Sequence, residues 1–232
     1  MHRVLVASLL LACGGVWAAP PGPGDWQALR GKNLALGVSG DRIDQTLDAC
    51  RKRGLSAQEA DRLLTATYAA KTENLPADCI HARIGEGLAK QISVPQISEA
   101  AQARLDYLRQ ARELVSLLRK GSPEGGRGGG PPHLVEHVGL ALESGLPPEV
   151  IQAVFTRKGP LRLGRLAHVV EIGEALHLAG FQPQQVQRIM TDLLDRNANR
   201  PEMVRVVGVL KAGLSDGKDF ETLYASLWVR SN

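Results

Sequence analysis

The sequence predicts an all-α protein, an α-solenoid-like array of about five helical hairpins, divided into two halves. Apolar residues recur at helical spacing along most of the chain, and no stretch shows the alternation typical of a β-strand. One junction pattern also occurs five times: Gly or Gln, a large apolar residue, then a residue that can begin a helix. The five junctions are Gly54-Leu55-Ser56, Gln91-Ile92-Ser93, Gly145-Leu146-Pro147, Gly180-Phe181-Gln182 and Gly213-Leu214-Ser215. Three of the four steps between them span 33 to 37 residues, a period typical of helix-pair repeats.

Each junction has the residues that end one helix and begin the next. A glycine just beyond a helix can adopt the left-handed conformation that closes the last turn, and the following apolar residue packs back onto that turn. Ser56 with Glu59, and Ser93 with Gln96, have the spacing of a capping box at the start of a helix. We therefore expect a helix on both sides of every junction.

The first 18 residues are interpreted as an export signal. A basic head, Met1-His2-Arg3, is followed by an apolar run from Val4 to Ala12 and a small-residue cleavage site before Ala19. This predicts a protein of the periplasm or cell envelope. Alternatively, Leu10-Leu11-Ala12-Cys13-Gly14 resembles a lipobox, in which Cys13 would be acylated and anchor the protein to a membrane. The apolar run is about half the length that spans a bilayer, so no transmembrane span is expected in the mature chain.

The rest of the chain divides by composition. Residues 19–40 begin with a Pro- and Gly-rich stretch and are predicted to be a flexible tether with at most one short helix. Hairpin repeats 1 and 2 are expected over 41–120, and repeats 3 to 5 over 133–232. Between them, residues 121–132 read GSPEGGRGGGPP, too rich in glycine for a helix, and are predicted to be a linker.

The two cysteines outside the export signal, Cys50 and Cys79, are an even number in an oxidising compartment. We expect a disulfide between them, tying the first hairpin to the second. The alternative is a pair of small buried thiols that do not meet.

A candidate metal site is the run His133-Leu134-Val135-Glu136-His137. It resembles the HxxEH zinc motif of the inverzincin metallopeptidases, which implies His133 and His137 as ligands and Glu136 as the base that activates water. The same first four positions recur as His168-Val169-Val170-Glu171, where Ile172 replaces the second histidine. We therefore interpret the run as a repeat consensus with a coincidental second histidine, expect no metal or cofactor, and keep a zinc-dependent hydrolase as the alternative.

A candidate contact for an anion or a partner is the basic segment containing Arg157, Lys158, Arg162 and Arg165. Solvated charges at helix ends are the alternative interpretation. The net charge of +4 is too small and too dispersed to predict nucleic-acid binding. Glu143, at the end of a predicted helix, is expected to be an ordinary solvated glutamate.

The Gly145-Leu146-Pro147-Pro148-Glu149 turn and its repeats resemble those of exported bacterial proteins built from repeated helical hairpins, a group with no established activity. Stacked hairpins expose long surfaces suited to proteins or peptides. The sequence therefore predicts a non-catalytic binding or scaffolding module of the cell envelope, with a protein or peptide partner, rather than an enzyme.

Overall fold

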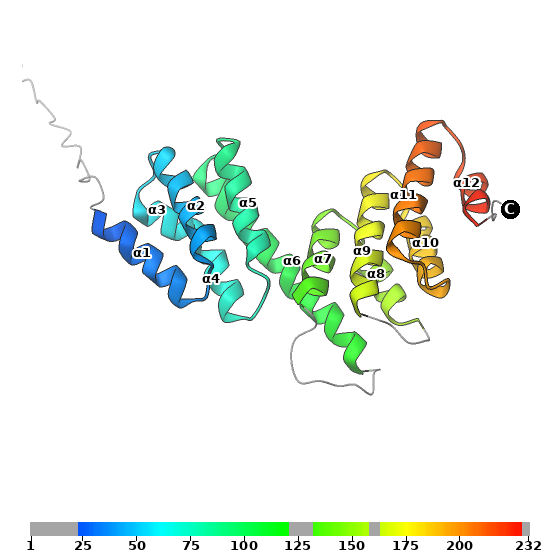
Figure 1. Ribbon diagram of the computed structural model, residues 1–232, viewed down its shortest axis with the longest axis horizontal. Coiled ribbons are helices and arrows are strands. Elements are labelled where there is room, and N and C mark those ends of the chain that lie inside the picture. The colour runs from blue at the N-terminus through cyan, green and yellow to red at the C-terminus, as the bar shows by residue number, and fades with distance from the viewer. Residues whose placement is uncertain (1–22, 121–131, 158–162, 229–232) are drawn as a thin grey trace, which may run out of the picture.

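A computed structural model describes residues 23–120, 132–157 and 163–228 of the chain (Figure 1). Within these residues every regular element is helical and there is no strand, which confirms the all-α prediction. The twelve helices are α1 (Pro23–Ala35), α2 (Gly40–Lys52), α3 (Ala57–Leu63), α4 (Thr65–Thr72), α5 (Asp78–Ala89), α6 (Val94–Lys120), α7 (Pro132–Glu143), α8 (Pro148–Phe155), α9 (Leu163–Leu178), α10 (Pro183–Asp195), α11 (Arg200–Ser215) and α12 (Phe220–Leu227). The expected export signal and nearly all of the expected linker lie outside the described residues.

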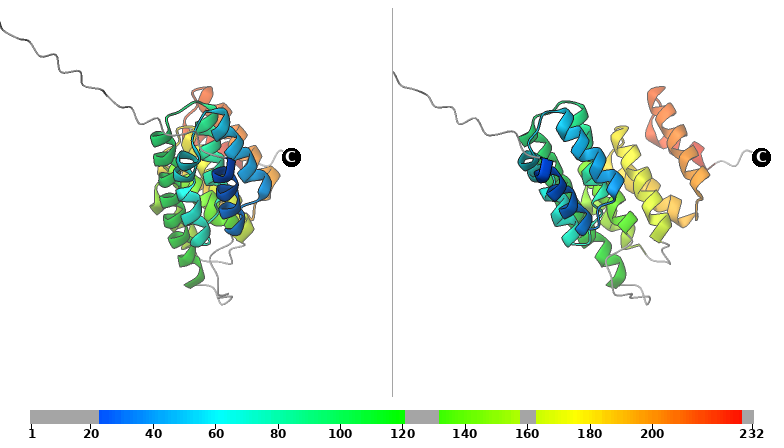
Figure 2. Two further views of the ribbon diagram at one scale, coloured as in Figure 1. Left: turned by 90° about the vertical axis from the view of Figure 1, so that its left-hand side faces the viewer. Right: turned by 60° about the vertical axis from the view of Figure 1, so that its left-hand side comes forward.

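The helices follow one another in a row from α1 to α12, as the views in Figures 1 and 2 show. On one side of the row α2 packs on α5, α7 on α9, and α9 on α11. On the other side α4 packs on α6, α6 on α8, and α8 on α10. The long helix α6 packs extensively on α7, so the chain before and after the expected linker meets through these two helices.

Eight turns between helices share one hydrogen-bonding pattern. A residue with positive φ ends the helix, and the amide of the next residue donates to the carbonyl five positions before it, which is a Schellman motif. Four of the turns are predicted junctions and are confirmed, with φ of 69° at Gly54, 56° at Gln91, 93° at Gly145 and 94° at Gly180. Three turns that the sequence pattern did not reveal use Gly37, Asn74 and Asn197.

The eighth turn corrects the fifth predicted junction. Gly213-Leu214-Ser215 is not a turn but lies inside α11. The left-handed residue is Gly217, with φ of 73°, and the amide of Lys218 donates to the carbonyl oxygen of Gly213 at 3.0 Å. Asp219 then caps α12 by accepting a hydrogen bond from the Thr222 amide at 3.0 Å. The interpretation was wrong because two glycines stand four residues apart, and only the second is beyond the helix end.

The expectation of a flexible tether over 19–40 is also corrected. Residues 23–35 form α1, and α2 begins at Gly40. Trp26 and Leu29 are buried in the core, and Asn33 donates hydrogen bonds to the Leu29 carbonyl and to the Tyr68 hydroxyl of α4. These contacts explain why the segment is ordered: its few large side chains find partners that its Gly- and Pro-rich beginning does not suggest.

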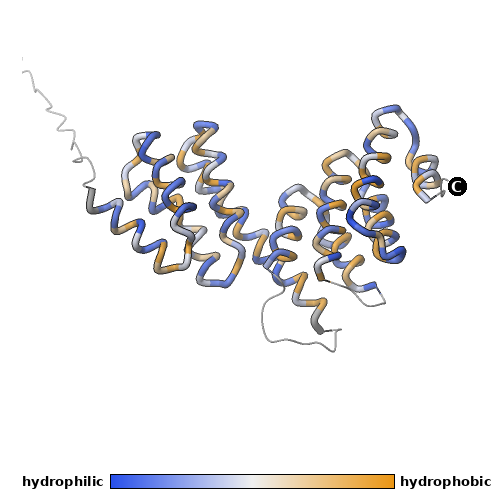
Figure 3. Tube along the Cα trace, in the orientation of Figure 1, coloured by the Kyte–Doolittle hydropathy of each residue, from blue (hydrophilic) through white to orange (hydrophobic). Residues whose placement is uncertain are grey.

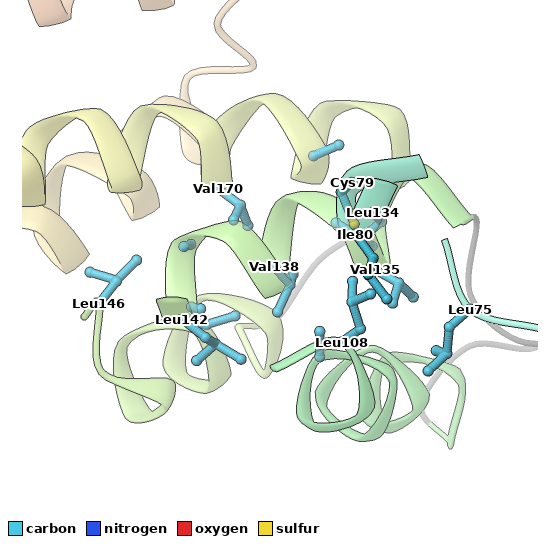
Figure 4. Packing of buried hydrophobic residues seen from close by; sticks show 14 of the residues in the cluster. Leu75, Cys79, Ile80, Leu108, Leu134, Val135, Val138, Leu142, Leu146 and Val170 are labelled. Carbon is cyan, nitrogen blue, oxygen red and sulfur yellow. The ribbon is translucent and has the colours of Figure 1, made fainter. Parts of the chain in front are cut away.

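The core forms one continuous cluster that runs from α1 to α12. Hydrophobic and hydrophilic residues alternate around each helix (Figure 3), so each helix turns one apolar face inward. Figure 4 shows the packing where α5, α6, α7 and α9 meet, with Leu108 of α6 beside Val135 of α7. At the same place Gly139 lets α6 approach closely, since a Cβ there would lie 3.0 Å from Cδ2 of Leu108. Among the described residues no helix combines the length and apolarity needed to cross a membrane.

Candidate functional site

The predicted basic segment is only partly described. Lys158 and Arg162 lie outside the described residues, as does Cys13. Arg157, which directly follows Thr156 at the end of α8, forms an ion pair with Asp195 of α10 and is therefore already engaged within the fold. Arg165 lies in the first turn of α9, and no acidic side chain among the described residues pairs with it. Of the two predicted cations that the structure describes, Arg165 is thus the one without an ion-pair partner.

The HxxEH run lies in the first two turns of α7, so His133 and His137 share one face. Their Nε2 atoms are 3.3 Å apart, and the two rings stand edge to face with centroids 4.4 Å apart. Burial lowers the pKa of His137, and the charge of His133 acts in the same direction, whereas Glu171 and Glu136 oppose them. His137 therefore favours neutral imidazole, the form that can bind a metal.

The neighbouring helix α9 carries the related His168 and Glu171, with His168 Nδ1 3.5 Å from Glu171 Oε2. The alignment of the two HΦΦE runs thus corresponds to two helices that pack side by side. Within the residues that the structure describes, no three His, Cys, Asp or Glu side chains are grouped closely enough to hold a metal ion.

The expected disulfide between Cys50 and Cys79 is not formed, and both are free, buried thiols. The charges closest to Cys50 are Arg51 and Arg53 of its own chain segment, whereas Cys79 lies near Glu136 and Arg104 and donates to the Pro76 carbonyl at 3.4 Å. The two side chains therefore face different surroundings. Burial raises the pKa of each thiol to about 11, so both are unreactive at neutral pH.

A partly buried ion-pair cluster, which sequence reasoning missed, joins α5, α6 and α7. Arg83 Nη2 lies 3.0 Å from Glu143 Oε1, and Arg104 binds the other oxygen of the same carboxylate. Arg104 is only 9% exposed, so its charge depends on this partner. Glu143 is consequently not a solvated residue at a helix end, as its position in the sequence suggested, but the acceptor that joins three helices.

Glu174 of α9 lies beside this cluster. Burial raises the pKa of its carboxyl, Arg104 opposes this, and the charges of Glu171 and Glu143 add to the increase. The cluster is thus a compact arrangement of opposite charges at the centre of the row, with a role in joining helices rather than an evident cleft for a substrate.

A shallow depression of about 320 Å³ lies where the beginnings of α9 and α11 meet. It is lined by Gly164, Arg165, His168, Ala198, Asn199, Arg200 and Met203. Arg200, like Arg165, has no acidic partner among the described side chains. No sequence signal connected Arg200 with Arg165, because only the packing of α9 on α11 brings them to one place.

The helices α9 and α11 also expose large apolar side chains. Leu178 is 66% exposed, Val204 is 61% exposed and Leu214 is 40% exposed. On α11, Val204 is one turn after Arg200 and lies on the same side of that helix, whereas Leu178 and Leu214 lie at the carboxyl-terminal ends of α9 and α11, away from the depression. We call the exposed apolar side chains Leu178, Val204 and Leu214 of these two packed helices the α9/α11 face. In comparisons with known proteins, no family model, no curated protein and no solved structure matched this chain.

Proposed function

We propose that the chain is an exported, non-catalytic binding or scaffolding module of the cell envelope, and that the α9/α11 face receives a protein or peptide partner. The observation that carries this proposal is the exposure of Leu178 and Val204 on two neighbouring helices. Exposed apolar surface marks interaction sites on proteins, and these side chains are the most exposed large apolar ones among the described residues.

The exposed apolar side chains can supply part of the energy of a contact. Complete burial of a Leu or Val side chain contributes about 1.5 to 3 kcal/mol, and because Leu178, Val204 and Leu214 are already partly covered, burial of their exposed remainder offers roughly 3 to 5 kcal/mol before the entropic cost of association. The two helices are anchored in the core by Leu176, Val206 and Leu210. The binding surface is therefore already ordered, and little conformational entropy is lost on this side of the interface when a partner binds.

Site-specific photo-crosslinking in intact cells tests the proposal. A photoreactive amino acid at position 178 or 204 is expected to give a discrete adduct with a partner. The same amino acid at Gln152, an exposed position of α8 on the other side of the row, is the control and should give none. Equal adducts at 152 and 178 would indicate diffuse contacts and argue against a binding face.

The location in the envelope rests on the sequence of residues 1–18 alone. Fractionation of cells tests it: an exported soluble protein is released with the periplasm, and an acylated protein stays with membranes. A Cys13→Ser variant distinguishes the two, because it releases a lipoprotein from the membrane fraction and leaves a soluble exported protein unchanged. Recovery of the full-length chain in the cytoplasm would contradict export.

A zinc-dependent hydrolase using His133, Glu136 and His137 is the second candidate. The observation in its favour is the Nε2 separation of 3.3 Å. Two nitrogens bound to a tetrahedral zinc ion at about 2.0 to 2.1 Å are themselves about 3.3 Å apart. Metal analysis of the purified protein tests this candidate: stoichiometric zinc that is lost in His137→Ala and retained in His177→Ala would favour it over the binding module.

A further inference from the structure

The depression between α9 and α11 has the composition of an anion site. Two guanidinium groups, Arg165 and Arg200, come from different helices, and no acidic side chain in the described part of the chain pairs with either one. Arginine without a partner at a concave surface is well suited to an oxyanion, because its planar donors can form two parallel hydrogen bonds.

The other lining residues add donors and an apolar floor. The Asn199 Oδ1 accepts the Glu202 amide at 3.0 Å, which leaves its NH₂ group as a donor. The Nδ1 of His168 faces Glu171, so its Nε2 is the nitrogen left for a ligand. Met203 and Ala198 are 2% and 4% exposed and form the apolar part of the lining.

Two carboxylates stand close to the depression. Glu202 accepts the Asn199 amide at 2.7 Å in the capping box of α11, and Glu171 Oε2 lies 3.5 Å from His168 Nδ1. Among the described residues neither carboxylate forms an ion pair with Arg165 or Arg200. The depression also lies at the amino-terminal ends of two 16-residue helices, α9 and α11, where the helix dipoles favour negative charge.

We infer that this depression binds the phosphate group of a phosphate monoester. Two unpaired guanidinium groups match the two negative charges of a phosphate monoester. A carboxylate carries a single negative charge and would be matched by one guanidinium group. The volume of about 320 Å³ is at the low end of small-molecule pockets and suits a phosphate with a few attached carbon atoms, which would lie on Met203. The inference goes beyond the proposed protein contact and does not depend on it.

Titration of the full chain with inorganic phosphate at constant ionic strength tests the site, read by NMR of methyl-labelled methionine. The Met203 methyl signal is expected to shift in a saturable way, whereas Met190, buried against Gly173, should not respond. Sulfate should compete because it is also a tetrahedral dianion, and acetate should not. Absence of a saturable Met203 shift would overturn the inference.

Matched charge variants locate the binding. Arg165→Gln and Arg200→Gln should each weaken phosphate binding about tenfold or more. Lys211→Gln removes the same charge from an exposed position of α11 and should change it by less than about twofold. Equal weakening in all three variants would show a response to net charge alone and overturn the site.

The source of the phosphate group is distinguished by two further probes. Binding of glycerol phosphate that depends on Arg165 and Arg200 supports a soluble ligand. Binding to vesicles that contain phosphatidic acid, with no binding to phosphatidylcholine vesicles and the same arginine dependence, supports a lipid headgroup. Failure of both probes together with inorganic phosphate would overturn the inference, and it would leave the crosslinking result at position 178 unaffected.

Discussion

The backbone of Gly213 in α11 lies directly against the side chain of Leu223 in α12. A Cβ at Gly213 would come within 3.0 Å of Leu223 Cγ, which is closer than carbon atoms pack. Leu223 is 4% exposed and holds the last helix on the row. The absence of a side chain at Gly213 is therefore a packing requirement between two helices, and the turn that follows is made by Gly217.

This relationship predicts opposite effects for two glycines of one helix. Gly213→Ala should destabilise the protein by about 1 kcal/mol, because displacement of Leu223 outweighs the better helix propensity of alanine. Gly208→Ala, where a Cβ meets nothing within 4 Å, should stabilise it by up to about 1 kcal/mol. Chemical denaturation measures both, and a change of the same sign in the two variants would contradict the packing.

The burial of His81 predicts that the protein loses stability at acidic pH. The ring is 2% exposed, and burial lowers its pKa to about 4 from an ordinary value of 6.5. Above pH 6.5 both states are neutral at this residue, and as the pH falls from 6.5 toward 4 only the unfolded state binds the proton. The free energy of unfolding should therefore fall in this window by up to about 3 kcal/mol.

The His81→Leu variant should lose less stability than the wild type between pH 7 and pH 4.5, because it removes the group that titrates. Urea denaturation at the two pH values measures the difference. Ile80→Leu, a buried change on the same helix that removes no titratable group, is the control and should keep the full pH dependence. The same loss in His81→Leu and in the wild type would show that other groups cause it.

The Arg83–Glu143–Arg104 cluster predicts a large loss of stability when Glu143 is changed. Glu143→Gln leaves the buried charge of Arg104 without its carboxylate and should cost about 2 kcal/mol of stability. Glu149→Gln removes the same charge from an exposed position in the first turn of α8 and should change stability by less than about 0.5 kcal/mol. Similar midpoints for both variants in thermal unfolding would contradict the role of Glu143.

Cys50 and Cys79 should behave as buried free thiols. Non-reducing mass mapping should recover both peptides unlinked, and a reductant should leave the thermal midpoint unchanged. Alkylation of the folded protein at pH 7 should be slow, since burial and a pKa of about 11 keep both groups protonated. Rapid alkylation is expected only after unfolding, and a linked Cys50–Cys79 peptide would contradict the structure.

The helices could be predicted from the sequence because their signals are local. The Ser56–Glu59 capping box forms as its spacing predicts, with the Ser56 amide donating to Glu59 at 2.8 Å and the Glu59 amide donating to Ser56 at 3.2 Å. The paired apolar residues of α8 and α10 are buried, including Ile151 and Met190. The turns at Asn74 and Asn197 were missed because asparagine adopts the left-handed conformation less often than glycine and gives a weaker signal.

The candidate site could be predicted only in part. Arg165 was identified from the density of charge around it, but Arg200 is 35 residues away and reaches the same depression only through the packing of α9 on α11. Glu143 was misinterpreted for the same reason, since its partners Arg83 and Arg104 are on two other helices. Long-range contacts of this kind leave no pattern in a single sequence.

Crosslinking at position 178, with and without a second change on the same face, tests whether the α9/α11 face holds a partner. The photoreactive residue at 178 should give one discrete adduct in cells. Val204→Asp should abolish that adduct with little change in the thermal midpoint, because Val204 is 61% exposed in the free protein. An adduct that persists unchanged in the Val204→Asp background, or no adduct at 178 at all, would show that the α9/α11 face does not hold a partner.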